Sequence, residues 1–583
     1  MKKLTILLSL LLLINCTKQD QNSDNFDFTT VFEKSNGMET PTYPQIIDYY
    51  EKLANRYATI NLQEIGETDS GHPLHIITFN PEINFNFEEL HKQGKNVLLI
   101  NNGIHPGESD GIDASMLLFR DLAEQKIKTS QNTIIVAIPV YNVGGALNRN
   151  SGTRTNQNGP EAYGFRGNAR NYDLNRDFIK NDTRNAQTFA KIFHKVKPDL
   201  FIDNHVSNGA DYQYTLTHLF TQHNKLGGEI GNYLHTELQP QLEASLAQKK
   251  WDITPYVNVW GTTPDKGWSQ FMDSPRYSTG YTTLWNTPGL MVETHMLKPY
   301  KKRVEGTYEL LFSAIEILEK DGTKIKKLRN ESTNHWKTVK DYPITWQVDT
   351  SKSTKFNFKG YEGDFIDSKI TGKQRLKYDR NKPYTKEVNY KNYFIPSNTI
   401  SIPKAYILPK GWRNIKNLLD INNIRYSTLA KDSIMNVEVL TIDSFKTQNN
   451  PFEGHYIHYN TQVKKSNQNM TFQKGDLIIP TDQEGIRYLI ETLEPEAPDS
   501  FFNWNFFDTI LQQKEGFSPY VWEDKAYELL QNDSKLKNEF EEKRKDTAFA
   551  NNWYAQLDWL HKQSSNYEKA HLRYPVYRLK KEN

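Results

Sequence analysis

The sequence is poor in cysteine, in net charge and in long apolar runs. Its 583 residues include one cysteine, and 72 Lys and Arg residues balance 70 Asp and Glu residues, for a net charge of +2. A single cysteine excludes internal disulfides and zinc or iron–sulfur sites built on several thiolates, so any metal must bind His, Asp or Glu. The charge balance provides no field that attracts nucleic acid, and we expect no nucleic-acid partner.

Apolar runs are short along the whole chain. No segment after the N-terminal region has about 18 consecutive apolar residues, the length that spans a bilayer. At the N-terminus, Lys2 and Lys3 precede an apolar stretch over residues 4–14, which has the length of a signal-peptide core. We therefore expect residues 1–15 to be a signal peptide and the polar residues 16–39 to be a flexible tether.

The one cysteine, Cys16, ends the sequence Leu13-Ile14-Asn15-Cys16. This sequence resembles the lipobox of bacterial lipoproteins, in which the cysteine is lipidated and becomes the mature N-terminus. The resemblance implies an exported protein that contacts a membrane only through a lipid on Cys16, at the bacterial envelope. The alternative is an ordinary secretory signal, which would give a periplasmic or secreted protein.

From about residue 40, short apolar runs alternate with helical patterns. We predict helices over 44–57, 112–125, 184–194 and 300–319, and buried strands over 97–100, 133–138, 200–202 and 290–292. Strands that alternate with helices of 10–15 residues indicate an α/β fold, here a mixed, mainly parallel sheet flanked by helices. We expect this unit to be the catalytic domain and to cover residues 40–325.

The composition changes after residue 325. Residues 326–400 are charged and polar with short alternating segments such as 344–348, which predicts a β-rich accessory region. A strand at 405–409 followed by a helix at 412–419 indicates a C-terminal α/β accessory domain over 401–583. Five aromatic residues within 501–507 predict a packed contact between domains, because each ring buries a large area.

Residues that can carry chemistry follow the predicted strands. His105 and Glu108 stand in the turn after the strand at 97–100, separated by a Pro-Gly pair, and the turn can bring both side chains toward one ion. His205 follows the strand at 200–202. A catalytic zinc site needs three such nitrogen or oxygen ligands and an open fourth position. Taken singly, each of these residues is more often structural than a metal ligand.

Two further features favour a hydrolytic site. An Arg- and Asn-rich segment, 166–178, lies between the candidate ligands, and the strand at 290–292 delivers Glu293 at its end. Apolar neighbours would desolvate this carboxylate and raise its pKa toward that of an effective base.

In the order and type of these residues the chain resembles the zinc carboxypeptidase family, that of carboxypeptidases A, B, N and E. The resemblance covers about residues 40–325. It implies one zinc ion per chain, bound by His105, Glu108 and His205, the His₂Glu set of carboxypeptidase A. It also implies that Glu293 is the catalytic glutamate.

The same resemblance implies roles for the segment between the ligands. Asn175 and Arg176 match the pair that binds the terminal carboxylate of the substrate. Arg166 matches the arginine that polarises the scissile carbonyl in the carboxypeptidase N/E branch. Arg170 is a nearby alternative, and the spacing to Asn175 favours Arg166.

The catalytic tyrosine is left open by the sequence. Tyr277 and Tyr281 both lie in the stretch shortly before Glu293, and we favour Tyr277.

These residue types suit peptide hydrolysis. A three-ligand zinc lowers the pKa of bound water toward ~7, Glu293 can accept the proton, and Arg176 presents a planar fork that matches a carboxylate. The expected function is a zinc metallocarboxypeptidase that hydrolyses the C-terminal bonds of peptides or proteins. Two alternatives stay open: a zinc amidohydrolase that deacylates N-acyl amino acids, and a surface lipoprotein that binds peptide or glycan and keeps a residual zinc site.

Overall fold

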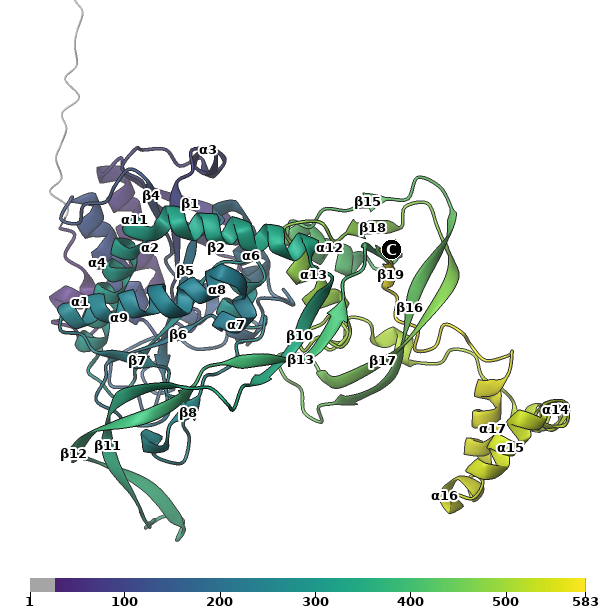
Figure 1. Cartoon of the computed structure of the whole chain (residues 1–583). Helices are drawn as coiled ribbons and strands as arrows, with labels where there is room; N and C mark the ends of the chain where they lie inside the picture. The colour runs from purple at the N-terminus through teal and green to yellow at the C-terminus, as the bar shows by residue number, and fades with distance from the viewer. Residues whose placement is uncertain (1–26, 582–583) are drawn as a thin grey trace, which may run out of the picture.

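The computed structural model describes residues 27–581 (Figure 1). The expected signal peptide and the lipidated Cys16 lie outside the described residues, as does the first part of the expected tether. Its second part differs from a tether, because helix α1 (Val31–Lys34) packs on the first domain. Phe28 and Phe32 are buried there, and Arg120 donates to the carboxylate of Glu33 at 2.7 Å.

An eight-stranded mixed sheet forms the centre of the first domain. Its order is β1-β2-β4-β3-β5-β9-β6-β7. The central neighbours β3–β4, β3–β5 and β5–β9 are parallel, as is β6–β7, whereas β1–β2, β2–β4 and β6–β9 are antiparallel. The strands are β1 (Ile60–Glu67), β2 (Pro73–Phe79), β3 (Asn96–Asn101), β4 (Thr133–Ile138), β5 (Leu200–Ser207), β6 (Leu216–Phe220), β7 (Ile253–Pro255) and β9 (Gly289–His295).

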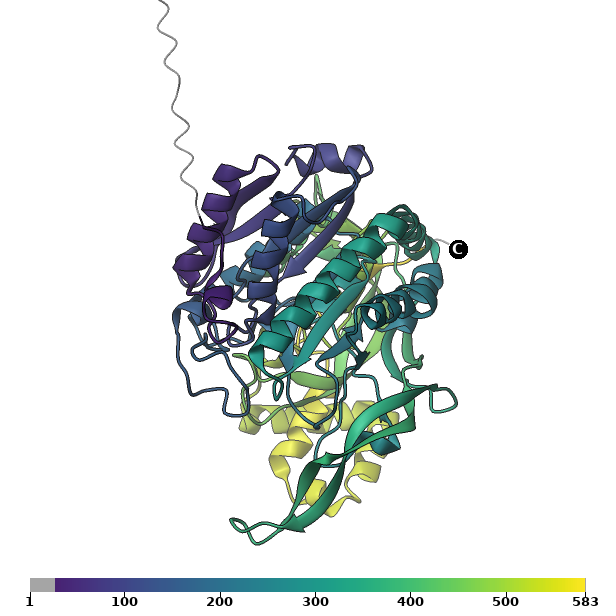
Figure 2. The same cartoon turned by 90° about the vertical axis from the view of Figure 1, so that its left-hand side faces the viewer.

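Helices cover both faces of this sheet, which explains why β3, β4 and β5 are buried along their whole length. Figure 2 looks onto the face where α2, α4 and α11 lie side by side. On the other face α6 and α10 meet through the rings of Phe193 and Tyr281. The helices are α2 (Tyr43–Arg56), α3 (Phe87–Lys92), α4 (Asp110–Ala123), α5 (Val143–Leu147), α6 (Arg184–Val196), α7 (His223–Leu226), α8 (Gly228–Tyr233), α9 (Gln239–Gln248), α10 (Ser278–Thr283) and α11 (Tyr300–Thr338).

The predicted fold class is therefore confirmed: a mixed sheet flanked by helices, followed by a β-rich region. Helix α11 differs from the prediction, because it continues to Thr338 instead of ending near Glu319, and so runs through the expected domain boundary at 325/326. In this extension the side chains of Ile325 and Trp336 are buried. Arg329 forms an ion pair with the buried Asp199 at 2.6 Å. The charged residues after position 325, from which we expected a boundary, lie on the side of this helix that is exposed or forms ion pairs.

The β-rich region that follows contains two antiparallel pairs. Strands β10 (Asp341–Val348) and β13 (Phe394–Ser401) pair with each other, and β11 (Thr354–Asp367) and β12 (Gln374–Lys391) form a long hairpin that projects from the body of the molecule (Figure 1). The hairpin is joined to the first domain by β8 (Trp268–Ser269), which pairs with β12.

The C-terminal domain contains a second sheet of six strands, in the order β15-β18-β14-β19-β16-β17. Its pairings are antiparallel. The strands are β14 (Ala405–Leu408), β15 (Ser427–Thr428), β16 (Ser433–Thr447), β17 (His458–Phe472), β18 (Leu477–Pro480) and β19 (Tyr577–Leu579), and α12 (Arg413–Ile421) and α13 (Ile486–Leu493) accompany them.

A small group of helices projects from this domain (Figure 1) and has its own apolar core around Trp522 and Phe540. It consists of α14 (Pro519–Asn532), α15 (Ser534–Lys543), α16 (Thr547–Ala550) and α17 (Trp553–Gln563). Among residues 27–581, no helix combines the length and the apolar character that crossing a membrane requires.

The aromatic run at 501–507 lies between the domains, as predicted. Phe501, Phe502, Trp504 and Phe507 are fully buried. The Trp504 ring faces Lys180 of the first domain at 5.4 Å.

Candidate active site

The candidate active site lies where three neighbouring parallel strands end. His105 stands in the turn after β3, His205 lies in β5 and Glu293 lies in β9. Strand β5 pairs with both β3 and β9, and His205 is the register partner of Glu293. Because the carboxyl ends of adjacent parallel strands open on one edge of a sheet, these side chains reach the same crevice.

A cavity of about 620 Å³ occupies this crevice. All eight site residues predicted from the sequence lie on its wall: His105, Glu108, Arg166, Asn175, Arg176, His205, Tyr277 and Glu293. The structure thus brings together residues that are up to 188 positions apart, from His105 to Glu293.

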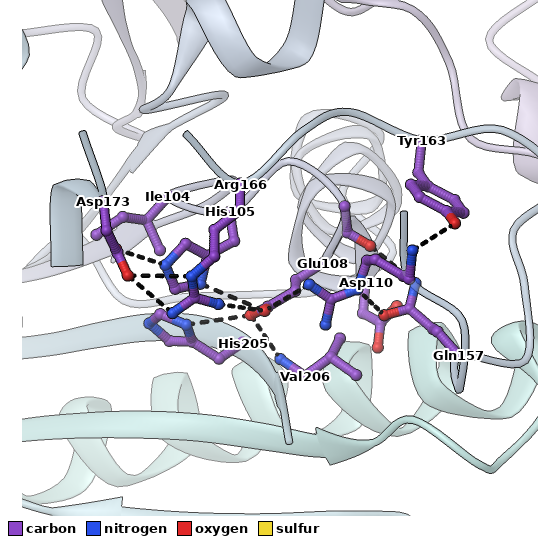
Figure 3. A network of polar contacts seen from close by, with 12 residues as sticks. Ile104, His105, Glu108, Asp110, Gln157, Tyr163, Arg166, Asp173, His205 and Val206 are labelled. Atoms are coloured by element: carbon purple, nitrogen blue, oxygen red, sulfur yellow. Dashed lines mark hydrogen bonds and ion pairs between the residues drawn. The ribbon is translucent and has the colours of Figure 1, made fainter. Parts of the chain in front are cut away.

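His105, Glu108 and His205 form a compact, buried group (Figure 3). One ligand atom from each lies within 4.8 Å of the others. His105 Nδ1 is 3.3 Å from one oxygen of Glu108, and His205 Nδ1 is 3.2 Å from the other. Within residues 27–581 no second cluster of three His, Cys, Asp or Glu side chains could hold a metal in this way.

Two further carboxylates orient the imidazole rings. His105 Nε2 lies 2.9 Å from Asp173, and His205 Nε2 lies 2.9 Å from Asp203. These contacts turn both Nδ1 atoms toward Glu108, an arrangement typical of metal-binding histidines. Nδ1 of His105 is buried and has no hydrogen-bond partner. A buried nitrogen that makes no hydrogen bond, next to a second imidazole and a carboxylate, fits a zinc ion.

Asp203 and Asp173 were not among the predicted residues. Asp203 precedes His205 by two positions on β5, so alternation along the strand would have placed it on the same face. Asp173 directly precedes the 3₁₀ turn Leu174–Arg176 and accepts from the backbone N–H of Asn175 at 2.9 Å. One carboxylate therefore holds both His105 and the turn that carries Asn175 and Arg176.

Glu108 is held as an anion. Burial raises the pKa of this carboxyl, but His105 and Arg154 lower it well below its usual range. Arg154 Nη1 is 3.0 Å from Glu108. Sequence reasoning missed Arg154, because it lies in the irregular loop after α5 where no periodicity marks it. Gly107 makes room for it, since a Cβ at that position would lie 2.5 Å from Arg154 Cδ.

The pKa of Glu293 is shifted in the opposite direction, upward. Desolvation is the main cause that raises its pKa to about 7, while His205 lowers it and Glu108 raises it. A carboxyl group that titrates near neutral pH can both take and return a proton. The expectation that the end of β9 would give a carboxylate with a raised pKa is thus confirmed.

The structure distinguishes between the two candidate arginines. Arg166 lies on the cavity wall, donates from Nε to Asp173 at 3.0 Å and stands 3.6 Å from Glu108. Arg170 lies outside the cavity, with its guanidinium 5.0 Å from the centre of the Tyr172 ring.

The two candidate tyrosines are distinguished in the same way. Tyr277 lies on the cavity wall, and the guanidinium of Arg176 stacks over its ring at 4.5 Å. Tyr281 is fully buried elsewhere and donates from its hydroxyl to Asn422 at 2.8 Å. Next to Tyr277, the N–H of Ser278 donates to Asn175 Oδ1 at 3.4 Å. Asn175, Arg176 and Tyr277 therefore form one connected group.

Part of the chain is similar to a known family. Residues 46–202 match a family model described as zinc carboxypeptidase. The matched family is that of the zinc carboxypeptidases. The matched segment includes the first two candidate ligands and the Asn175–Arg176 pair, and it supports a peptidase enzyme.

The chain is also similar to curated fungal proteins. Carboxypeptidase 2 of Trichophyton rubrum is 21% identical over 427 residues, which cover 69% of this chain and 72% of that protein. Carboxypeptidase 2 of Trichophyton tonsurans is 27% identical over 103 residues, 18% of this chain and 19% of that protein. The chain therefore spans most of the first relative and about a fifth of the second.

Solved carboxypeptidase structures show distant likeness. A metallo-carboxypeptidase from Burkholderia cenocepacia has 14% identity and a TM-score of 0.35, covering 47% of this chain and 68% of that one. Carboxypeptidase A from Helicoverpa armigera has 12% identity and a TM-score of 0.34, covering 50% and 73%.

Proposed function

We propose that this protein is a zinc-dependent metallocarboxypeptidase that hydrolyses the C-terminal bonds of peptides or proteins, with one zinc ion per chain. The observation that carries the proposal is that one cavity joins the His105–Glu108–His205 group, a carboxyl group that titrates near neutral pH, and the Asn175–Arg176 pair. The match of residues 46–202 to the zinc carboxypeptidase family supports it.

The Asn175–Arg176 pair would select substrates with a free C-terminus. The guanidinium of Arg176 offers two parallel N–H donors that match the two oxygens of a carboxylate, and the amide of Asn175 adds a third donor. The contact of the Arg176 guanidinium with the Tyr277 ring, at 4.5 Å from the ring centre, would help to hold it in place. An enzyme that cuts inside a chain has no need of such a clamp, so this pair favours removal of terminal residues.

Glu293 would act as the general base and then as the general acid. Its carboxylate would take the proton of the attacking water and later give it to the nitrogen of the leaving amine. A zinc ion bound by His105, Glu108 and His205 would lower the pKa of a water ligand toward ~7 and polarise the scissile carbonyl.

Arg166 and Tyr277 would complete the site. Arg166 is fixed by Asp173 and extends into the cavity, where its positive charge would stabilise the oxygen of the carbonyl under attack. The hydroxyl of Tyr277 would donate a hydrogen bond to the bound peptide from the wall that holds Arg176.

Two peptides of one sequence, one with a free C-terminal carboxylate and one with a C-terminal amide, test this function. We expect mass spectrometry to show the loss of a single C-terminal residue from the free peptide, and little change in the amide. Equal cleavage of both peptides, or cleavage inside the chain, would contradict the proposal. Hydrolysis of N-acyl amino acids without any hydrolysis of peptides would instead favour a deacylase, and binding without turnover would favour a binding protein.

We also propose that the protein is exported and anchored to a bacterial membrane by a lipid on Cys16. The support is the sequence alone, in which two lysines, an apolar stretch and Leu13-Ile14-Asn15-Cys16 follow one another. Expression with a labelled fatty acid should label the parent protein and not the Cys16→Ser variant. Unlabelled parent protein in the soluble fraction would show an ordinary secretory signal instead.

A further inference from the structure

Two segments that carry cavity residues also contact the C-terminal domain. The first, residues 172–182, contains Asn175 and Arg176, and the second, residues 276–278, contains Tyr277. Their partners in the C-terminal domain are Phe452, Glu453, His455, Asp499 and Trp504, which we call the seam. The seam thus contacts the two segments that carry the group that would bind the substrate carboxylate.

Asp499 fixes the residue that precedes Tyr277. The backbone N–H and the Nε of Arg276 both donate to this carboxylate, at 3.0 and 2.8 Å, and the guanidinium lies 4.9 Å from the Trp504 ring. Asp499 is fully buried. Burial raises the pKa of its carboxyl, but Arg276 lowers it below the usual range. A buried ion pair of this kind is strongly disrupted when one partner loses its charge.

Glu453 fixes the residue that precedes Leu174 and Asn175. Its carboxylate accepts from the backbone N–H of Asp173 at 2.8 Å. The next residue, Gly454, has a φ of +80°, and a Cβ there would lie 2.7 Å from the hydroxyl of Tyr172. Glycine is thus required for this loop, 448–457, to approach the catalytic domain so closely.

His455 fixes the far end of the same segment. Its Nε2 lies 2.7 Å from Asp182, and the fully buried Lys180 bridges Asp182 and Asp177, at 2.7 Å from each. The residues of segment 172–182 are therefore held at both ends by loop 448–457.

We infer that the seam positions Asn175, Arg176 and Tyr277 to bind the C-terminal carboxylate of the substrate, with Asp499 and Glu453 as the positioning residues. This inference rests on the carboxypeptidase function proposed above. It gives the C-terminal domain a part in substrate recognition although no seam residue lines the cavity. The loss of the seam would weaken substrate binding through the position of Arg176 and leave the zinc ligands in place.

A matched control separates positioning from general stability. Glu491 is also a fully buried carboxylate of the C-terminal domain that pairs with a cation of the catalytic domain, Lys225, at 3.2 Å. Neither Glu491 nor Asp499 lies on the cavity wall. Glu491→Gln and Asp499→Asn make the same chemical change, but only Asp499 adjoins a segment that carries cavity residues.

Kinetics on a peptide with a free C-terminus test the inference. We expect Asp499→Asn to raise KM at least tenfold while kcat changes less than threefold, because the interaction lost is made equally in the ground state and the transition state. The inhibition constant of the amino acid that the enzyme releases should rise by the same factor, since that product keeps the carboxylate. Glu491→Gln should keep KM, kcat and the inhibition constant within twofold of the parent protein.

A second pair of variants applies if Asp499→Asn fails to fold. Glu453 lies on a surface loop, and Glu453→Ala removes the acceptor for the Asp173 N–H, whereas Glu453→Gln keeps one. We expect the alanine variant to raise KM at least fivefold and the glutamine variant to restore it, with zinc content by mass spectrometry equal in both.

Three outcomes would overturn the inference. KM within twofold of the parent in both Asp499→Asn and Glu453→Ala would show that the seam has no part in binding. An equal rise of KM in Glu491→Gln would show a merely structural role of the seam. So would a loss of zinc from the seam variants that accounts for their whole rise of KM. Equal cleavage of free and amidated peptides by the parent protein would instead contradict the proposed function, and that measurement involves no seam variant.

Discussion

His205 and Glu293 are register partners on the parallel strands β5 and β9. A candidate metal ligand and the candidate general base are thus held at a fixed separation by two backbones in the middle of the sheet. No loop movement is needed to bring them together, whereas Asn175 and Arg176, the proposed carboxylate-binding residues, lie in an irregular segment that contacts the seam.

The first prediction concerns Glu293. Glu293→Gln keeps the size of the side chain and removes its ability to take a proton, so we expect kcat to fall by about 10²–10⁴-fold. Zinc content should stay at the level of the parent protein, because Glu293 is not among the candidate ligands. Unchanged turnover of a peptide by this variant would show that another group is the base.

The second prediction is the pH dependence of kcat/KM. The raised pKa of Glu293, about 7 against an ordinary 4.5, means that the carboxyl takes up a proton as the pH falls through that value. A bound cation would lower this pKa, so we expect an acidic limb with a midpoint between 4.5 and about 7, below which activity falls about tenfold per pH unit. A profile that stays flat down to pH 4 would contradict the assignment.

The third prediction concerns the carboxylate clamp. Arg176→Lys keeps the charge and removes the planar fork, and we expect kcat/KM on a free-carboxylate peptide to fall about tenfold to a hundredfold, as for the loss of a charged hydrogen bond. Arg170→Lys is the matched control, since Arg170 also lies in the Arg- and Asn-rich segment 166–178 but outside the cavity. Equal effects of the two substitutions would show that Arg176 is not the clamp.

The site residues that could be predicted from the sequence are those that lie at the ends of buried strands. His105, His205 and Glu293 follow or end buried apolar runs, and the edge of a parallel sheet collects such residues. Arg154 was missed, and the sequence favoured Tyr277 over Tyr281 without deciding between them, because both points depend on how loops fold over the cavity. The length of α11 was missed because the charges on Lys326 and Arg329 are satisfied by Asp199, a partner distant in the sequence.

The seam was predicted only in part. The aromatic run at 501–507 indicated a buried contact between domains, which is confirmed. The contacts that matter for the site are made by polar residues, Glu453, His455 and Asp499, which have no pattern in the sequence. Their partners lie more than 200 residues away along the chain.

The fourth prediction concerns stability. Asp113 of α4 is fully buried and accepts from the hydroxyls of Thr40, at 2.6 Å, and of Tyr300. Burial raises the pKa of its carboxyl to about 7 from 3.8. Between these two values the unfolded chain loses this proton while the folded protein keeps it, so the free energy of unfolding falls as the pH rises, by about 1.4 kcal/mol per unit.

Asp113→Asn removes this titration. We expect urea unfolding to show that the variant gains stability relative to the parent protein as the pH is raised from 4 to 7, by a few kcal/mol at most. Below pH 4 the difference should be constant, because the carboxyl is protonated in both states. A difference that is independent of pH from 4 to 7 would show that Asp113 is ionised in the folded protein.

The most direct measurement is a zinc titration of chelator-treated protein, following the release of the C-terminal amino acid from a free-carboxylate peptide. We predict that activity rises linearly and stops at one zinc ion per chain, and that His105→Ala and His205→Ala bind no zinc at the same concentration. Full activity without zinc, or stoichiometric zinc binding by both alanine variants, would contradict the assignment of His105, Glu108 and His205 as the centre of a metallocarboxypeptidase.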